Sequence, residues 1–237
     1  MFQLDFMKTL IIAPHPDDEV FGCGGLLHRL KAAGGEVYVL YMTVGTAADF
    51  SPRGQSSAEE RVAELEEVVR FLDLDGHAIA FPGNDFHLRL DAVPQKDLVH
   101  AIERGTNVSL QELRPDLVLT TSTADYNQDH RAVGEATLSA LRPGSPKYKS
   151  FQPLVLTYEL PYHQWNLTPS LPSPSLYVRL DADAMQAKRS ALELYQSQLK
   201  APDSPLSIRG VEVLASYRGL SCGAPAAEAY QIKRLVV

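Results

Sequence analysis

Hydrophobic and polar positions follow two different periods along the first two-thirds of the chain. Continuous apolar and β-branched runs, typical of buried strands, span residues 7–13, 36–43, 77–81 and 115–122. Between them, apolar spacing at steps of three and four or flanking glycines predict helices over 20–33, 58–72, 95–103 and 130–141. Strands that alternate with helices of this length predict an α/β fold, a mostly parallel sheet with helices on both faces.

The pattern changes beyond residue 142. Residues 151–165 and the stretch "LPSPSLYVRLD" are rich in proline and serine and contain only short strand-like pieces. One helix is predicted over 183–199, and the chain closes on the strand-like "QIKRLVV". We therefore expect one domain over 1–237, with a core of about 1–142 and a smaller β-rich appendage of about 143–237 packed on the sheet.

Composition excludes several classes of function. The 237 residues are 45% hydrophobic and 22% charged, which suits a globular domain with a real core. A net charge of −7 without any basic block argues against nucleic acid or an anionic membrane surface as the main partner. Two cysteines fit a reducing compartment, and we find neither a signal peptide nor a bilayer-spanning run. We expect a cytoplasmic protein.

The candidate chemistry lies in "IIAPHPDDEVFGCGG", residues 11–25, where one histidine and three acidic residues follow the first strand directly. Such a cluster is costly to desolvate unless a positive charge lies among its members. A second polar stretch, residues 125–130, follows the fourth strand. Ligands of such sheets bind beyond the carboxyl ends of the strands, so both stretches point to the same edge. They predict a divalent metal site.

His15 and Asp18 are three residues apart and can converge at a strand-to-helix turn, and His130 suits a third ligand. Two imidazole nitrogens and one carboxylate suit Zn²⁺ or Fe²⁺, with positions left for water and substrate. Asp17 would lie beside the metal, where a carboxylate can take a proton from metal-bound water and deliver it to a leaving amine. Asp129 is predicted to orient His130 through its far nitrogen.

Simpler interpretations exist for parts of this pattern. An acidic cluster after a strand also suits the positive end of a helix dipole, and a single histidine such as His130 is more often a capping or core residue. The shared sheet edge weakens both interpretations. The glycines at 22, 24 and 25 do not form a dinucleotide loop, since Leu27 stands where that motif needs glycine. We expect them to let the helix approach the sheet or the metal loop closely.

"APHPDDEVFGCGG" together with "QDHRAVG" resembles the PIG-L/LmbE family of metal-dependent N-deacetylases, and the similarity extends over most of the chain. The resemblance implies a Rossmann-like sheet and removal of the acetyl group from an N-acetylglucosamine-type sugar or its conjugate. It implies His15, Asp18 and His130 as zinc ligands and Asp17 as the general base. The implied partner is a small-molecule or conjugated N-acetyl amino sugar. A homo-oligomer is left open, since family members often form symmetric assemblies.

Three further residues are implied as substrate-binding. Arg61 and Glu64 match a family R-x-x-E helix whose arginine contacts sugar, although on sequence grounds alone an exposed salt bridge between them is the favoured explanation of the spacing. Asp85 falls where the family often has an aspartate in a substrate loop, with a turn aspartate as the alternative. "YQSQ" at 195–198 is similar to a family H-x-S-Q helix in which Tyr195 replaces the histidine.

One departure from the family pattern concerns Asn127, which stands where many members have a histidine. Asparagine can donate a hydrogen bond to an oxyanion but cannot carry a proton in this pH range, so Asp17 would act as both base and acid. Asn127 also favours an alternative, a non-catalytic sugar-binding protein that retains its metal. A further alternative with the same ligands is an Fe(II) facial-triad oxygenase. The aromatic-rich segment with Tyr158, Tyr162, His163 and Trp165 either lines the pocket or is ordinary core and rim.

Overall fold

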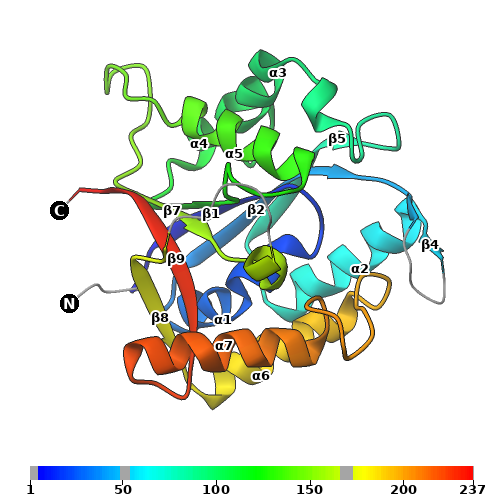
Figure 1. Ribbon diagram of the computed structural model, residues 1–237. Coiled ribbons are helices and arrows are strands. Elements are labelled where there is room, and N and C mark those ends of the chain that lie inside the picture. Colours follow the sequence, from blue (N-terminus) through cyan, green and yellow to red (C-terminus); the bar gives the residue numbers. More distant parts are fainter. Residues whose placement is uncertain (1–4, 49–53, 166–172, 237) are drawn as a thin grey trace.

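The computed structural model describes residues 5–48, 54–165 and 173–236 (Figure 1). The strands of this part are β1 Lys8–Ala13, β2 Glu36–Val44, β3 Ala47–Ala48, β4 Gln55–Ser56, β5 Gly76–Pro82, β6 Leu117–Thr120, β7 Leu154–Tyr158, β8 Leu176–Leu180 and β9 Ala226–Leu235. The helices are α1 Asp18–Ala32, α2 Ala58–Phe71, α3 Gln95–His100, α4 Leu110–Leu113, α5 Gln128–Ala140, α6 Ala182–Leu194 and α7 Ile208–Cys222. Short turns of helix are η1 Leu90–Ala92, η2 Ala101–Gly105 and η3 Pro161–Trp165.

Seven strands form one sheet in the order β5-β2-β1-β6-β7-β9-β8. The first five are parallel, whereas β9 runs antiparallel to both β7 and β8. This arrangement confirms the predicted α/β fold with a mostly parallel sheet. The chain leaves β1 toward β2 and β5 and then returns to β6 on the other side. The strand order therefore reverses between β1 and β6, the place where sheets of this type bind their ligands.

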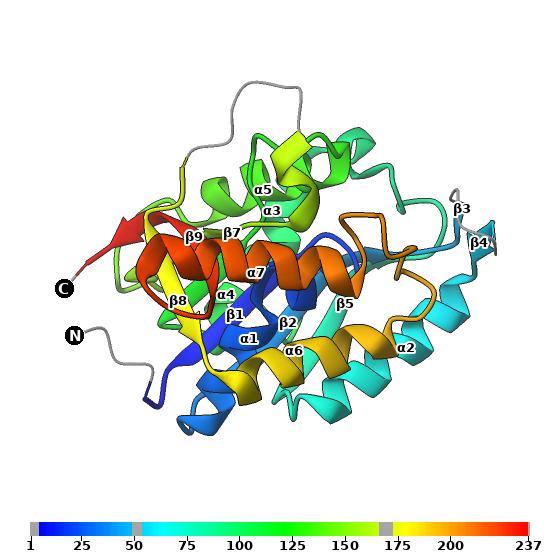
Figure 2. The same cartoon turned by 60° about the horizontal axis from the view of Figure 1, so that its bottom comes forward.

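Helices cover both faces of the sheet (Figures 1 and 2). On one face lie α1, α2, α6 and α7, and on the other α3, α4 and α5. Alternate residues of β1 enter different cores, as the period of a strand requires. Ile11 and Ala13 belong to the core under α1, and Leu10 and Ile12 to the core under α5. A strand apolar on both faces is thus explained by burial on both faces.

The C-terminal third continues the sheet and is not merely packed on it. Its strands β7, β9 and β8 form the far side of the same seven-stranded sheet. Its helix α6 packs on α1. The predicted helix over 183–199 ends at Leu194, and turns follow over residues 195–198. Because this third closes over α1, it belongs to the surroundings of the predicted site.

Helix α7 was not predicted from the sequence. Its inward face carries small or short side chains, including Ala215 and Gly219. Large apolar side chains stand on its outer face, where Val213 is 61% and Leu220 82% exposed. Because the outer face is also apolar, the two faces of α7 do not differ in polarity, and it is this difference that predicts an amphipathic helix from sequence.

Two glycines of α1 allow the close helix approach that was expected of them. A Cβ atom at Gly22 would lie 2.5 Å from a ring carbon of Tyr158, and one at Gly25 would lie 2.6 Å from the Leu180 side chain. Both distances are too short for any other residue without movement of the neighbour. These glycines therefore set how near the start of α1 lies to the sheet.

A buried ion pair fastens the same helix. Lys188 Nζ of α6 lies 2.6 Å from Glu228 Oε1 of β9 and donates a hydrogen bond to the Phe21 carbonyl. The Glu228 carboxylate accepts the N–H groups of Gly25 and Leu26. Both charges are thus paired and hydrogen-bonded, which offsets the cost of their burial.

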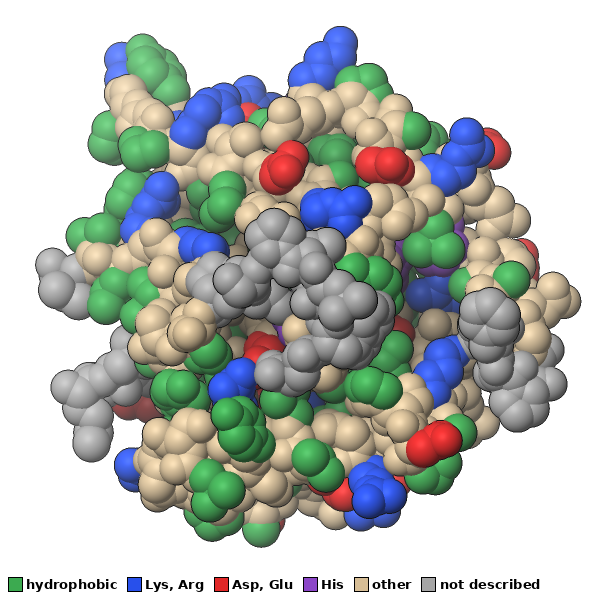
Figure 3. Space-filling view, viewed as in Figure 1, with side chains coloured by type: hydrophobic (Ala, Val, Ile, Leu, Met, Phe, Trp, Pro, Cys, Tyr) green, Lys and Arg blue, Asp and Glu red, His purple; other side chains and the backbone are tan. Residues whose placement is uncertain are grey.

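Two further features are the distribution of charge on the surface and the length of the helices. Acidic and basic side chains are interspersed on the face shown in Figure 3. Within the described ranges, none of the helices has both the length and the hydrophobicity to cross a bilayer.

Candidate active site

Two loops at the switch point of the sheet, together with the first turns of the helices that follow them, carry the polar residues singled out from the sequence. The first, residues 14–17, joins β1 to α1, and the second, residues 121–127, joins β6 to α5. Since β1 and β6 are parallel neighbours, both loops leave the same edge. The predicted meeting of the two polar stretches is confirmed.

His15, Asp18 and His130 converge there, and all three are buried. His15 Nδ1 lies 3.3 Å from His130 Nε2 and 3.4 Å from Asp18 Oδ2. His130 Nε2 lies 3.2 Å from the same Asp18 oxygen. Three donor atoms thus form a nearly equilateral triangle.

This triangle fits a zinc ion. Tetrahedral zinc with bonds of roughly 2.1 Å to nitrogen and oxygen places neighbouring ligand atoms roughly 3.4 Å apart. Two imidazoles and one carboxylate also form a donor set that zinc accepts, with a position left for water or substrate. The residues present are therefore suited to hold the metal.

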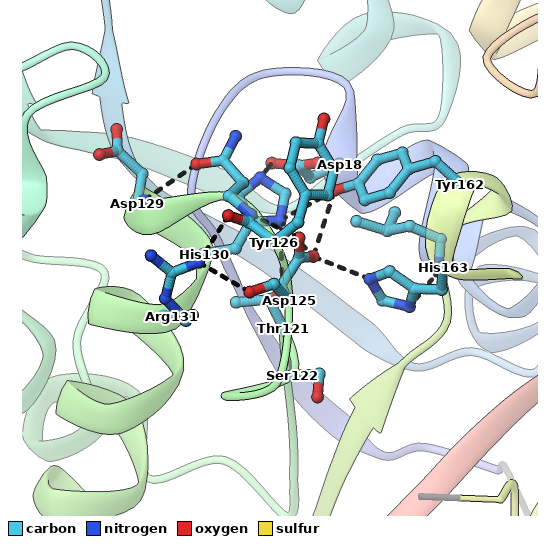
Figure 4. Close-up of polar contacts among 12 residues, drawn as sticks. Asp18, Thr121, Ser122, Asp125, Tyr126, Asp129, His130, Arg131, Tyr162 and His163 are labelled. Atoms are coloured by element: carbon cyan, nitrogen blue, oxygen red, sulfur yellow. Dashed lines mark hydrogen bonds and ion pairs between the residues drawn. The ribbon is translucent and has the colours of Figure 1, made fainter. Parts of the chain in front are cut away.

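The outer nitrogen of each histidine is bonded to its own aspartate. His15 Nε2 lies 3.0 Å from Asp129 Oδ2, and His130 Nδ1 lies 3.0 Å from Asp125 Oδ2. The prediction that Asp129 orients His130 is wrong. Consecutive helix residues point roughly 100° apart, so these neighbours cannot face each other, and Figure 4 shows the Asp129 carboxylate turned away from His130. Asp129 also accepts the Leu90 N–H, 2.9 Å away.

The charges of the site favour a cation. Burial alone would lower the pKa of His130, but the carboxylates of Asp18 and Asp125 outweigh it and raise that pKa to about 10. Burial would likewise raise the pKa of Asp18, yet His130 and His15 hold it well below its usual range. The protein environment therefore stabilises positive charge where the donors meet.

Asp17 begins α1 with an unusual backbone. Its φ of 110° lies in a region that residues other than glycine seldom adopt. Its N–H donates to Glu19 Oε2 at 3.0 Å, and Glu19 Oε1 accepts the Tyr195 hydroxyl at 2.6 Å. Burial and the neighbouring Asp18 raise the pKa of the Asp17 carboxyl well above its ordinary value, which makes this carboxylate a stronger base than an exposed one.

Arg61 and Glu64 are both buried, so the alternative of an exposed salt bridge is wrong. Glu64 accepts the Ser197 N–H and hydroxyl, at 2.7 and 2.6 Å. Arg61 Nη1 donates to the Gly45 carbonyl and to His87 Nε2, at 3.2 and 2.6 Å. The positive charge of Arg61 favours the ionised form of Asp17 and so offsets part of the rise in the pKa of the Asp17 carboxyl. Arg61 therefore lies at the site, whereas the carboxylate of Glu64 holds the turn that follows α6.

The remaining predicted residues are placed differently. Asp85 is exposed in the turn after β5, and among the described residues no hydrogen bond or ion pair joins it to the donor triangle. Asn127 is the N-cap of α5, since its Oδ1 accepts the Asp129 N–H at 2.9 Å. Its Nδ2 group is then the one left to donate toward a substrate. Trp165 was named with the aromatic segment, but its side chain lies outside the described residues.

Sequence reasoning missed His87 as a residue of the site. It is buried, and its ring meets that of His15 edge-on with centroids 5.1 Å apart. Burial, together with the charges of His15 and Arg61, lowers the pKa of His87 to about 3, so the ring stays neutral. Arg61 can only donate, and it therefore fixes the His87 proton on Nδ1. The one available signal was its position two residues after Asp85.

Comparison with known proteins identifies the chain. A family model described as PIG-L, GlcNAc-PI de-N-acetylase, matches residues 10–141, which is more than half of the sequence and includes the whole donor triangle. The chain belongs to this family. The resemblance stated from the two sequence motifs is therefore confirmed.

Curated relatives of the PIG-L chain include two named deacetylases. The 2'-N-acetylparomamine deacetylase of Streptomyces fradiae is 32% identical over 170 residues, which are 65% of this chain and 57% of that protein. The diacetylchitobiose deacetylase of Thermococcus kodakarensis is 30% identical over 145 residues, 58% of this chain and 50% of that protein. The matched region thus spans only 50% to 57% of the length of these relatives.

Solved structures show the same fold. The conserved protein TT1542 from Thermus thermophilus matches with a TM-score of 0.70 at 26% identity, covering 98% of this chain and 97% of that chain. GalB, the 4-carboxy-2-hydroxymuconate hydratase from Pseudomonas putida, matches with a TM-score of 0.69 at 19% identity, covering 98% of both chains. A hydratase and deacetylases share this fold, so the function must be argued from the site.

Proposed function

We propose that this PIG-L family chain is a zinc-dependent N-deacetylase that removes the acetyl group of an N-acetylated amino sugar or its conjugate. The observation that carries the proposal is the convergence of His15 Nδ1, Asp18 Oδ2 and His130 Nε2 next to the partly buried Asp17. Membership of a family described as a de-N-acetylase, and two relatives named as deacetylases, support it.

The chain's own residues account for the steps of amide hydrolysis. Zinc, when bound, supplies a Lewis acid that polarises the acetyl carbonyl and acidifies water. Asp17 takes a proton from the attacking water at its carboxylate, and the water oxygen bonds to the acetyl carbonyl carbon. The carbon–nitrogen bond then breaks, the acetyl group leaves as acetate, and Asp17 returns the proton to the leaving amine. Asn127 donates from Nδ2 to the oxyanion. Arg61 and Asp85 bind the substrate, as the family pattern implies, and Glu64 contributes indirectly by holding the turn after α6 through Ser197.

Release of a primary amine from a panel of N-acetyl sugars tests this function. Free, nucleotide-linked, lipid-linked and glycoside-linked forms are each incubated with zinc-loaded wild type and with Asp17→Asn. Amine from one class that is lost in the variant establishes the deacetylase and its substrate class. Sugar binding without amine release would contradict the deacetylase and indicate a sugar-binding protein. Turnover that needs Fe²⁺, oxygen and a 2-oxo acid would contradict it too and indicate an oxygenase.

A further inference from the structure

Asp125 connects the metal-site loop to the C-terminal third of the chain. Its Oδ2 atom lies 3.0 Å from His130 Nδ1, 2.8 Å from His163 Nε2 and 3.2 Å from the Tyr162 hydroxyl. All four side chains are buried. In Figure 4, Asp125 lies between His130 and His163. The Tyr162 hydroxyl also lies 3.1 Å from His130 Nδ1. Asp125 and Tyr162 therefore both contact the ring nitrogen of His130 that faces away from the donor triangle.

The direction of these hydrogen bonds follows from one backbone group. The Leu160 N–H donates to His163 Nδ1 at 3.2 Å, which leaves the neutral ring with its proton on Nε2. His163 therefore donates to Asp125, and Asp125 accepts from His130 Nδ1–H. In the neutral form that binds a metal, His130 then has its lone pair on Nε2, the atom that faces His15 and Asp18.

We propose that His163 and Tyr162 are positioning residues for the metal ligand His130, and that they act through Asp125. The donors on the aspartate fix its carboxylate, and the carboxylate fixes the tautomer and the ring angle of the ligand. The short helix η3 thus takes part in metal binding although it supplies no ligand. The inference rests on the metal site of the proposed function and is independent of the substrate.

Simple packing does not explain these two side chains. Phenylalanine would fill the same volume without the cost of burying an imidazole and a hydroxyl. Both polar groups instead meet one carboxylate oxygen, and the His163 ring is held at its second nitrogen by Leu160. A polar network satisfied in this way is rigid and holds one geometry.

Zinc affinity and cobalt spectra test the proposal. Zn²⁺ is titrated into metal-free protein against a competing chromophoric chelator, and Co²⁺ is titrated to record the visible spectrum of the site. His163→Phe is expected to weaken zinc binding roughly 10- to 100-fold and to change the cobalt spectrum. His163→Gln, whose amide can donate from nearly the same place, is expected to recover most of that loss. His77→Phe, on β5 and paired with Glu66, is the matched control and should bind zinc like wild type.

Wild-type zinc affinity and spectrum in His163→Phe would overturn the proposal. An equal loss in the phenylalanine and glutamine variants would overturn the hydrogen-bond account and assign His163 to packing. If His163→Phe does not fold, Tyr162→Phe is the deciding variant, because it removes only a hydroxyl. A several-fold weaker zinc affinity in Tyr162→Phe supports the proposal, and an unchanged zinc affinity contradicts it. Lack of amine release by wild type would contradict the proposed function without affecting these titrations.

Discussion

At the scale of single residues, the unusual backbone conformation of Asp17 is held in place by hydrogen bonds with its neighbours. Among the residues that the structure describes, the other non-glycine ones with positive φ lie between 50° and 58°, the left-handed region, whereas Asp17 lies at 110°. Such strain persists only where surrounding contacts determine it. Here the Glu19 carboxylate holds the Asp17 N–H, and Tyr195 holds Glu19. Tyr195 thus has a hydrogen-bonding role close to the site.

Asp17→Asn is predicted to separate catalysis from metal binding. The amide cannot take a proton from water, so turnover should fall at least about 100-fold. Zinc affinity should stay close to that of wild type, because the donor triangle is unchanged. Steady-state amine release and chelator competition measure the two quantities, with Asp203→Asn, an exposed carboxylate, as the control. Wild-type turnover in Asp17→Asn would show that another group is the base.

At the scale of elements, α1 is held by contacts that lie away from the metal. Its first turn supplies Asp18, and its middle is fixed by Glu228 and Lys188 from the C-terminal third. The glycines of α1 bring the same helix against β7 and β8. Displacement of α1 would therefore move Asp18 relative to His130.

Lys188→Met is predicted to destabilise the protein by about 3–5 kcal/mol, because it leaves the Glu228 carboxylate buried without its cation. Urea unfolding measures the change. The exposed Lys96→Met should change the unfolding free energy by less than about 0.5 kcal/mol. The double variant with Glu228→Met should recover much of the loss, since no buried charge remains. A cost below about 1 kcal/mol for Lys188→Met would mean that the pair contributes little.

Glu103 of η2 makes the opposite helical layer sensitive to acid. Burial alone would raise its pKa, but Lys149 and Arg142 outweigh burial and lower it. The unfolded chain then binds the proton more tightly, so the stabilisation is complete above the unfolded pKa of about 4.3 and is lost as pH falls further. Glu103→Gln should reduce the unfolding free energy at pH 7 and change it less at about pH 3. Equal effects at both pH values, or a similar effect of the exposed Glu112→Gln, would contradict this assignment.

At the scale of the whole molecule, the site is a product of the sheet and not of one loop. Three donors come from the segments that follow β1 and β6, Arg61 comes from α2, and His163 comes from η3. The sheet and its two cores do not depend on the metal for their own hydrogen bonds or apolar contacts. The protein is therefore expected to fold without zinc and to gain stability when zinc binds.

Zinc at 100 times its dissociation constant should stabilise the folded state by about 2.7 kcal/mol, through mass action. Thermal unfolding with and without Zn²⁺ measures the shift. His130→Ala should fold and show no zinc-dependent shift, whereas His77→Ala should keep it. A zinc-dependent shift of wild-type size in His130→Ala would remove that residue from the ligand set. An unchanged melting temperature in wild type would contradict a zinc site altogether.

The sequence by itself determined the α/β fold, the family and the three residues that the structure brings together. Strand and helix periods are local properties, and parallel strands oblige the loops after them to share an edge, so His15, Asp18 and His130 could be assigned without coordinates. Tertiary structure alone decided that Asp129 serves His15 and that the C-terminal strands extend the sheet. It also decided that the His163 ring reaches Asp125, 38 positions away. Such hydrogen bonds depend on the rotation of a helix about its axis and on packing between distant segments, and the hydrophobic periodicity of the sequence predicts neither of these.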